Sequence, residues 1–214
     1  MSVGVVFGPD LDFAACSETA VGAGADQVRE RNPGEAPAVR AAAVRDMFTR
    51  GVGSLLLVER AVPVRPAWVR SGTLLALVAD HINLTGDNPL VGPNVDEWGP
   101  RFPDLTDAWD PDLRRAIRTR AVETGIGLQE GVVGGVAGAS RTAAELEMLR
   151  MMGADMASEG FVHEAIVARH AGRRVAGLAI LATGTELPGE MEALGKLVRE
   201  AVEALVSLRE ADRE

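Results

Sequence analysis

Cysteine is almost absent from this chain, and its scarcity excludes several kinds of protein. Cys16 is the single cysteine among 214 residues, so no disulfide can form within the chain. Such a composition suits a reducing compartment. No other cysteine and no histidine lies near Cys16 at the spacing of a zinc site. We therefore interpret Cys16 as a small buried apolar residue rather than a reactive thiol, and we expect neither a metal nor a cofactor.

Long apolar runs and an excess of positive charge are missing as well. No apolar stretch reaches the ~18 residues that a membrane span needs, and no basic segment followed by an apolar one opens the sequence. The formal net charge is −9 and the arginines are scattered, which disfavours binding to phosphate backbones and anionic lipid headgroups. These features predict a cytoplasmic protein that binds neither nucleic acid nor membrane.

Short apolar runs alternate with amphipathic stretches along the chain. Residues 3–8 (VGVVFG) have the pattern of a buried strand, and ligands bind at the carboxyl ends of such strands in open α/β sheets. Residues 26–43 are polar and broken by Pro33 and Pro37, which predicts a loop. The other expected strands are 53–58, 72–79, 131–137 and 175–182, and the expected helices are 38–50, 110–124, 142–152, 164–171 and 190–209. This order predicts one domain over residues 1–214, a three-layer α/β/α sandwich around a mixed sheet.

Three segments resemble, in the same order, segments of the trimeric purine nucleoside phosphorylases. They are residues 75–103 (LALVADHINLTGDNPLVGPNVDEWGPRFP), 128–145 (LQEGVVGGVAGASRTAAE) and 153–174 (GADMASEGFVHEAIVARHAGRR). The resemblance implies a nucleoside phosphorylase type of sandwich, a small-molecule substrate and a homotrimer. An aromatic residue at the position of Trp98 reaches the neighbouring subunit's sugar pocket in that family, so we expect Trp98 near an interface. The alternative is a Trp98 that packs within its own chain.

The positions at which the resembled family holds phosphate are changed here. The family's Gly-Ser-Gly loop after the first strand is replaced by Gly8-Pro9-Asp10, and its later phosphate-binding Ser is replaced by Gly160. Its Asn-Ala-Ala-Gly after the second central strand becomes Glu59-Arg60-Ala61-Val62, and no Arg-Phe-His motif lies between the two strands. Asp10 adds a negative charge, and Pro9 lacks an N–H donor. The comparison with the family therefore predicts that phosphate recognition is lost.

The positions that contact purine and sugar differ as well. The family's purine-binding Glu is absent after Gly138-Ala139-Ser140-Arg141-Thr142, and Thr183 replaces an Asn. Glu159 stands where the family has Met, and Arg141 stands where it has Phe. A carboxylate in a partly apolar pocket has a raised pKa, which suits a general acid or base. A guanidinium can bind an acidic or enolate substrate as a planar fork.

Glu159 and Arg141 are accordingly the predicted catalytic residues of an enzyme with a repurposed pocket. We expect dehydration, elimination, conjugate addition or cyclisation of a small molecule in specialised metabolism, without phosphate. The first alternative is a purine nucleoside phosphorylase or nucleoside hydrolase, and the second is an inactive binding or scaffold protein. The predicted substrate-binding residues are Asp10, Glu59, Trp68, Trp98, Thr142, Phe161, His163 and Thr183.

Several of these residues also fit a purely structural role. Glu159 either faces the pocket or turns to solvent, and His163 either contacts a ligand or simply starts a helix. Trp68 either lines the pocket or belongs to the core. A surface ion pair explains Arg141 nearly as well as a bound substrate does.

Overall fold

The computed structural model describes residues 2–9, 11, 13–32, 34–71, 74–138, 141–181 and 188–211, in which strands and helices alternate. The strands are β1 (Ser2–Phe7), β2 (Gln27–Glu30), β3 (Val52–Pro63), β4 (Leu75–Leu84), β5 (Gln129–Val136), β6 (Met156–Ser158) and β7 (Arg174–Leu181). The helices are α1 (Phe13–Gly22), α2 (Pro37–Thr49), α3 (Pro66–Ser71), α4 (Pro111–Glu123), α5 (Ala143–Met151), α6 (Val162–His170) and α7 (Pro188–Ala211). The predicted α/β class is confirmed.

One mixed sheet joins these strands in the order β2-β1-β3-β6-β5-β4-β7. Most neighbouring strands are parallel, whereas β6 runs antiparallel to β3 and β7 runs antiparallel to β4. Because β3 also pairs with β7, the strands β3, β6, β5, β4 and β7 close on themselves. The predicted mixed sheet is confirmed, but its closure was not foreseen, since an apolar run does not reveal which strands pair.

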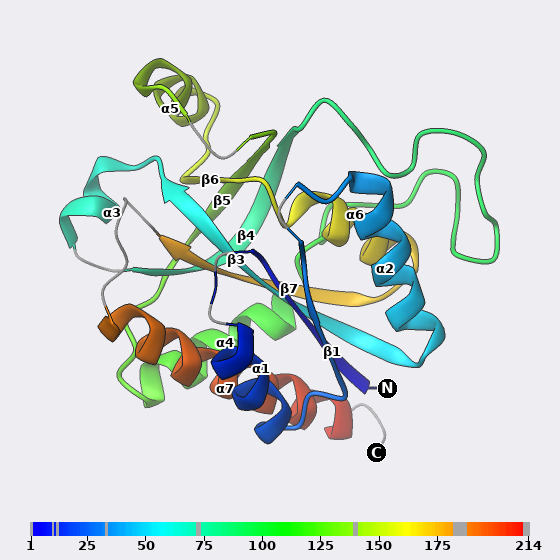
Figure 1. Cartoon of the computed structure of the whole chain (residues 1–214), viewed down its shortest axis with the longest axis horizontal. Coiled ribbons are helices and arrows are strands. Elements are labelled where there is room, and N and C mark those ends of the chain that lie inside the picture. Colours follow the sequence, from blue (N-terminus) through cyan, green and yellow to red (C-terminus); the bar gives the residue numbers. More distant parts are fainter. Residues whose placement is uncertain are drawn as a thin grey trace.

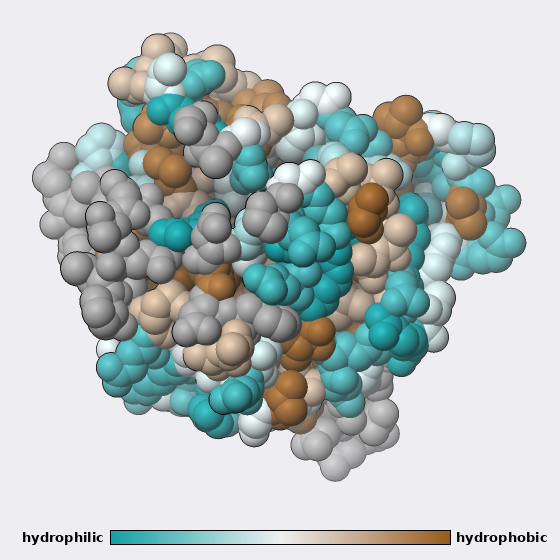
Figure 2. Space-filling model, in the orientation of Figure 1, coloured by the Kyte–Doolittle hydropathy of each residue, from teal (hydrophilic) through white to brown (hydrophobic). Residues whose placement is uncertain are grey.

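Helices cover the sheet on both faces, as the predicted sandwich requires (Figure 1). Helices α1, α4 and α7 lie on one face, and α2 and α6 lie on the other (Figure 1). The surface shown in Figure 2 mixes hydrophilic and hydrophobic residues in small patches. Among the described helices, none combines the length and the apolar character needed to cross a membrane.

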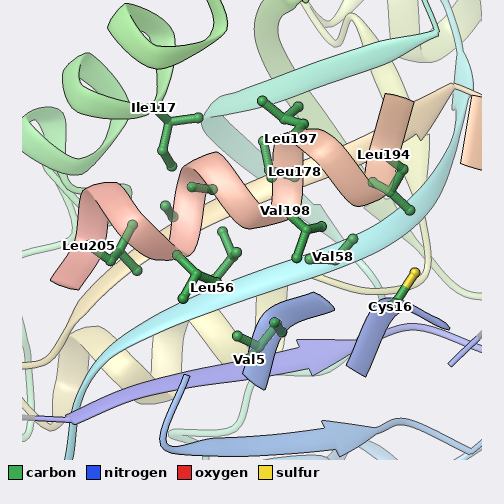
Figure 3. Close-up of a cluster of buried hydrophobic side chains, with 14 of the residues drawn as sticks. Val5, Cys16, Leu56, Val58, Ile117, Leu178, Leu194, Leu197, Val198 and Leu205 are labelled. Atoms are coloured by element: carbon green, nitrogen blue, oxygen red, sulfur yellow. The ribbon is translucent and has the colours of Figure 1, made fainter. Parts of the chain in front are cut away.

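Helix α7 supplies much of the core on its face of the sheet (Figure 3). Its Leu197 and Val198 are fully buried and belong to one cluster with Leu56 of β3. Burying one such side chain stabilises the fold by ~1.5–3 kcal/mol. Cys16 of α1 joins the same cluster and is 2% exposed, so its predicted role as a buried apolar residue is confirmed.

The predicted loop over residues 26–43 is wrong at both of its ends. Residues 27–30 form β2, which pairs in parallel with β1 at the edge of the sheet, and α2 begins at Pro37. The side chains of β2 are only partly buried, so polar residues are tolerated and no apolar run marks the strand. Pro37 suits the first turn of a helix because its missing N–H has no partner there in any case.

Candidate functional site

Three segments that are distant in sequence meet at the carboxyl end of β1, which lies beside the interior of β3. The two strands are parallel neighbours with Phe7 opposite Val58, so Gly8, which directly follows β1, lies beside Glu59 of β3. A Cβ added to Gly8 would overlap the Glu59 carboxylate, and so would one added to Gly160, which follows β6. The carboxylate therefore fills the space between two glycines. In α/β proteins, ligands commonly bind beyond the carboxyl ends of strands, and the carboxyl end of β1 lies here.

Arg31 holds the Glu59 carboxylate from the end of β2. Its Nε and Nη2 donate to Oε1 and Oε2 of Glu59 over 3.0 and 2.8 Å, and each side chain is 4% exposed. This is the bidentate fork that arginine forms with a carboxylate. Burial raises the pKa of Glu59 to about 7, although the hydrogen bonds and charge of Arg31 oppose that rise. Sequence reasoning missed Arg31, because the strand that precedes it lacks an apolar pattern.

A second set of buried, hydrogen-bonded polar side chains connects α2 with α6. Arg40 donates from Nη2 to Nδ1 of His163 over 3.0 Å and from Nη1 to the carbonyl oxygen of Glu159 over 3.0 Å. Its Nη1 also lies 3.7 Å from Oε1 of Glu164. A guanidinium has only donors, so Nδ1 of His163 accepts and Nε2 carries the proton. Burial and the charge of Arg40 lower the pKa of His163, which keeps its ring neutral.

The segment between β6 and α6 carries Glu159 and a strained turn. Phe161 has φ 76°, and the N–H of Val162 donates to the carbonyl of Gly160 over 3.0 Å, which closes a γ-turn. For a residue other than glycine this conformation costs about 1–3 kcal/mol and persists only when its surroundings enforce it. Phe161 is fully buried and packs edge-on against Trp109 with ring centroids 6.0 Å apart. The packing fixes the backbone on which the partly buried Glu159 stands.

Arg141 lies after β5, close enough to Glu159 for the two charges to interact. Its guanidinium donates to the carbonyl oxygens of Val136, over 3.3 Å, and of Gly138. Burial lowers the pKa of Arg141, and the negative charges of Glu159 and Glu145 oppose this. Arg141 is thus held by the backbone beside the site.

Thr142 has a structural task at the start of α5. Its hydroxyl accepts from the N–H of Glu145 over 3.2 Å, and its own N–H donates to Oε2 of Glu145 over 2.7 Å. The two residues form a capping box, which satisfies N–H groups that the first helical turn leaves unpaired. The side chain of Thr142 is exposed. Its predicted contact with a substrate stays a prediction.

The other predicted site residues are dispersed. Trp68 is 7% exposed and belongs to the core cluster on the α2–α6 face of the sheet. Trp98 is partly buried and packs against that same cluster. Asp10 and Thr183 lie outside the described residues. Within the described ranges, no group of three or more His, Cys, Asp or Glu side chains is arranged to hold a metal ion. The structure thus brings together Glu59, Phe161, His163 and the Glu159 backbone.

The chain is similar to known phosphorylases in both sequence and structure. Residues 71–209 match the family model of the phosphorylase superfamily. The chain is 42% identical over 139 residues to purine nucleoside phosphorylase 1 of Bacillus subtilis (strain 168), covering 64% of this chain and 51% of that protein. It is 37% identical over 180 residues to the purine nucleoside phosphorylase of Mus musculus, covering 77% of this chain and 62% of that protein. A crystal structure of the Schistosoma mansoni enzyme in complex with acetate superposes with a TM-score of 0.79 at 26% identity, covering 94% of this chain and 89% of that one.

This chain belongs to the phosphorylase superfamily. Its α/β sandwich is of the nucleoside phosphorylase type, as the resemblance of the three segments implied. The chain spans 51% and 62% of the length of the two curated relatives above.

The expected dehydration, elimination, conjugate addition or cyclisation is wrong. The curated relatives are purine nucleoside phosphorylases, so the comparisons favour the first alternative over a lyase or cyclase of specialised metabolism. The expectation gave too much weight to new ionisable residues in the pocket. An ionisable residue shows that charge is tolerated at its position, but not which bond is broken there. Arg141 illustrates this, since backbone carbonyls accept its hydrogen bonds.

Proposed function

We propose that this chain cleaves the N-glycosidic bond of a purine nucleoside, as an enzyme of the glycosyl-transferring type. The observation that carries the proposal is the 42% identity to a purine nucleoside phosphorylase over 139 residues. The position of the buried charges agrees with it, because they lie at the carboxyl end of β1, and ligands of α/β proteins bind beyond such strand ends.

The reaction makes two demands on the site. The bond between C1′ and the purine nitrogen breaks with its electron pair leaving on the purine, while an acceptor oxygen bonds to C1′. A proton donor beside the purine and a positive charge near it both assist this departure. We assign the first task to Glu159 and the second to Arg141. The substrate-binding roles of Phe161 and His163 are part of the same proposal.

The hydrogen-bond pattern supports Glu159 in particular. Four described ionisable residues were predicted at the site, and three of them, Glu59, Arg141 and His163, have partners inside the protein. The Glu159 carboxylate makes no hydrogen bond or ion pair with any other described side chain, although it is partly buried. A partly buried carboxylate that makes no hydrogen bond or ion pair with the described side chains can accept one from a ligand.

Base release from purine nucleosides tests the proposal. Inosine, guanosine and adenosine are each incubated with the protein, with and without phosphate, and free base is measured by liquid chromatography. Glu159→Gln keeps the shape but removes the exchangeable proton, so it should lower the rate by roughly 10²-fold or more. The matched control Glu130→Gln alters a carboxylate that pairs with Arg114 and Arg118, and it should keep the rate. If no base is released under any condition, the proposed activity is wrong.

We also propose a homotrimer, with the segment between β4 and α4 near the subunit contact. This segment projects from the body of the molecule as the long green loop of Figure 1. Its Val91 is 79% exposed and its Phe102 is 84% exposed, and burying such apolar side chains against another subunit would be favourable. Light scattering should give three times the monomer mass, and Phe102→Glu should reduce it. A monomer mass for the unaltered protein would contradict the trimer. A single domain and a cytoplasmic location stay predictions.

A further inference from the structure

Transfer of a sugar to inorganic phosphate needs buried positive charge or free N–H donors beside the sugar. In the part of the chain that the structure describes, two guanidinium groups are buried, those of Arg31 and Arg40. Arg31 directs Nε and Nη2 at the two oxygens of Glu59. Arg40 directs its two Nη atoms at the Glu159 carbonyl and at His163. Both cations are already bound to groups of the protein.

The backbone donors around Glu59 are bound as well. The N–H of Gly8 donates to the carbonyl of Val58 over 2.7 Å, and the N–H of Gly160 donates to Oγ of Ser158 over 3.2 Å. The Glu59 side chain packs so closely on both glycines that neither could carry a Cβ without overlap. A phosphate ion would meet the negative charge of the carboxylate there, and among the described residues the N–H groups of both glycines and the two buried guanidinium groups already have acceptors.

We propose that the Glu59 carboxylate is a built-in occupant of the anion position in this site, so that the glycosyl acceptor is water. A carboxylate and a phosphate present similar oxygens to an arginine fork, so one can take the place of the other. The identity of the acceptor rests on the proposed cleavage of nucleosides, whereas the occupied anion position does not. In the reaction, the water oxygen bonds to C1′ as the bond to the purine breaks. The electron pair goes to the purine, which takes its proton from Glu159, one water proton restores Glu159, and free ribose is the second product.

Removing the carboxylate should turn the occupied position into an anion site. Glu59→Ala leaves the Arg31 guanidinium buried without its partner, which lowers the melting temperature. Millimolar phosphate should then raise the melting temperature of the variant by about 5 °C or more above the effect of chloride at equal ionic strength. The unaltered protein should show no such rise. Glu130→Ala is the matched control, because it removes a carboxylate that pairs with Arg114 and Arg118 at partly exposed positions.

Calorimetric titration of the unaltered protein with phosphate tests whether the anion position is occupied, even if Glu59→Ala fails to fold. Specific binding of phosphate by the unaltered protein would overturn the inference. A folded Glu59→Ala variant that phosphate stabilises no more than it stabilises Glu130→Ala would also overturn it.

Product analysis separates this inference from the proposed function. Free purine and free ribose without phosphate, at a rate that phosphate does not raise, would support both. Purine release that requires phosphate and yields ribose 1-phosphate would overturn the inference and support the cleavage of nucleosides. If no purine is released, the proposed function is wrong, and the titration alone decides whether Glu59 occupies the anion position.

Discussion

The buried carboxyl of Glu59 should make the stability of the protein depend on pH within a defined window. Burial raises its pKa from the ordinary value of 4.5 to about 7, whereas in the unfolded chain the group titrates near the ordinary value. Between these two values the folded protein keeps a proton that the unfolded chain has released. The free energy of unfolding therefore falls as the pH rises through this window. The stabilisation that the protonated Glu59 contributes is complete below about pH 4.5 and lost above about pH 7.

The size of the effect follows from the two pKa values of Glu59. They differ by roughly 2.5 units, and each unit corresponds to 1.36 kcal/mol, which gives ~3 kcal/mol. This is a large part of the ~5–15 kcal/mol by which a folded domain is usually stable. Glu59→Gln keeps the size and shape of the side chain but cannot titrate. Between pH 5 and pH 8, the unaltered protein should therefore lose ~3 kcal/mol relative to this variant.

Urea unfolding followed by circular dichroism at pH 5, 6, 7 and 8 measures this difference. Every other titratable group is present in both proteins, so the difference between the two profiles isolates Glu59. Ile180→Val serves as a control, since it should lower the stability by about 0.5–1.5 kcal/mol at every pH without changing the shape of the profile. Parallel profiles for the unaltered protein and Glu59→Gln would refute the reasoning.

Two further predictions concern the framework of the site. Thr142→Ala removes the capping hydroxyl of α5 and should lower the free energy of unfolding by about 0.5–2 kcal/mol, with faster hydrogen exchange confined to that helix; unchanged exchange there would contradict the capping role. Gly160→Ala should lower the free energy of unfolding because its Cβ overlaps the Glu59 carboxylate. The loss of stability should be smaller when Glu59→Ala is also present. Strictly additive effects in that double-mutant cycle would show that the two side chains do not overlap.

The sequence predicted those elements that carry an apolar pattern. Residues 131–137 were expected as a strand and form β5 at Gln129–Val136, and the helix expected over 164–171 is α6 at Val162–His170. The short strands β2 and β6 were missed. Strand β2 is polar and partly exposed at the sheet edge. Strand β6 has only three residues, so it is held in an extended conformation by its pairing with β3 and β5 on either side. Tertiary pairing, rather than local sequence, determines both strands.

The buried pair between Arg31 and Glu59 could not have been predicted for a related reason. The two residues are 28 positions apart, and Arg31 directly follows β2 whereas Glu59 lies within β3 of the same mixed sheet. Their contact depends on the register of β1 with both β2 and β3, which a single sequence does not specify. Glu59 was expected to face a substrate, but its oxygens instead accept from Arg31.

The hydrogen-bond partners of the ionisable residues distinguish those with a structural role from those that can act on a substrate. Sequence comparison marked Glu59, Arg141 and Glu159 alike, because each places a charge where the resembled family has none. A buried charge is stable only when it is paired or hydrogen-bonded, so the first question about each is what satisfies it. Arg31 satisfies Glu59, and backbone carbonyls satisfy Arg141. Among the described side chains, none pairs with the Glu159 carboxylate, while Arg40 and the γ-turn at Phe161 hold its backbone in place. A residue whose backbone is fixed and whose carboxylate has no hydrogen bond or ion pair to the described side chains can receive a ligand, which is why the activity of Glu159→Gln is the sharpest test of the proposed reaction.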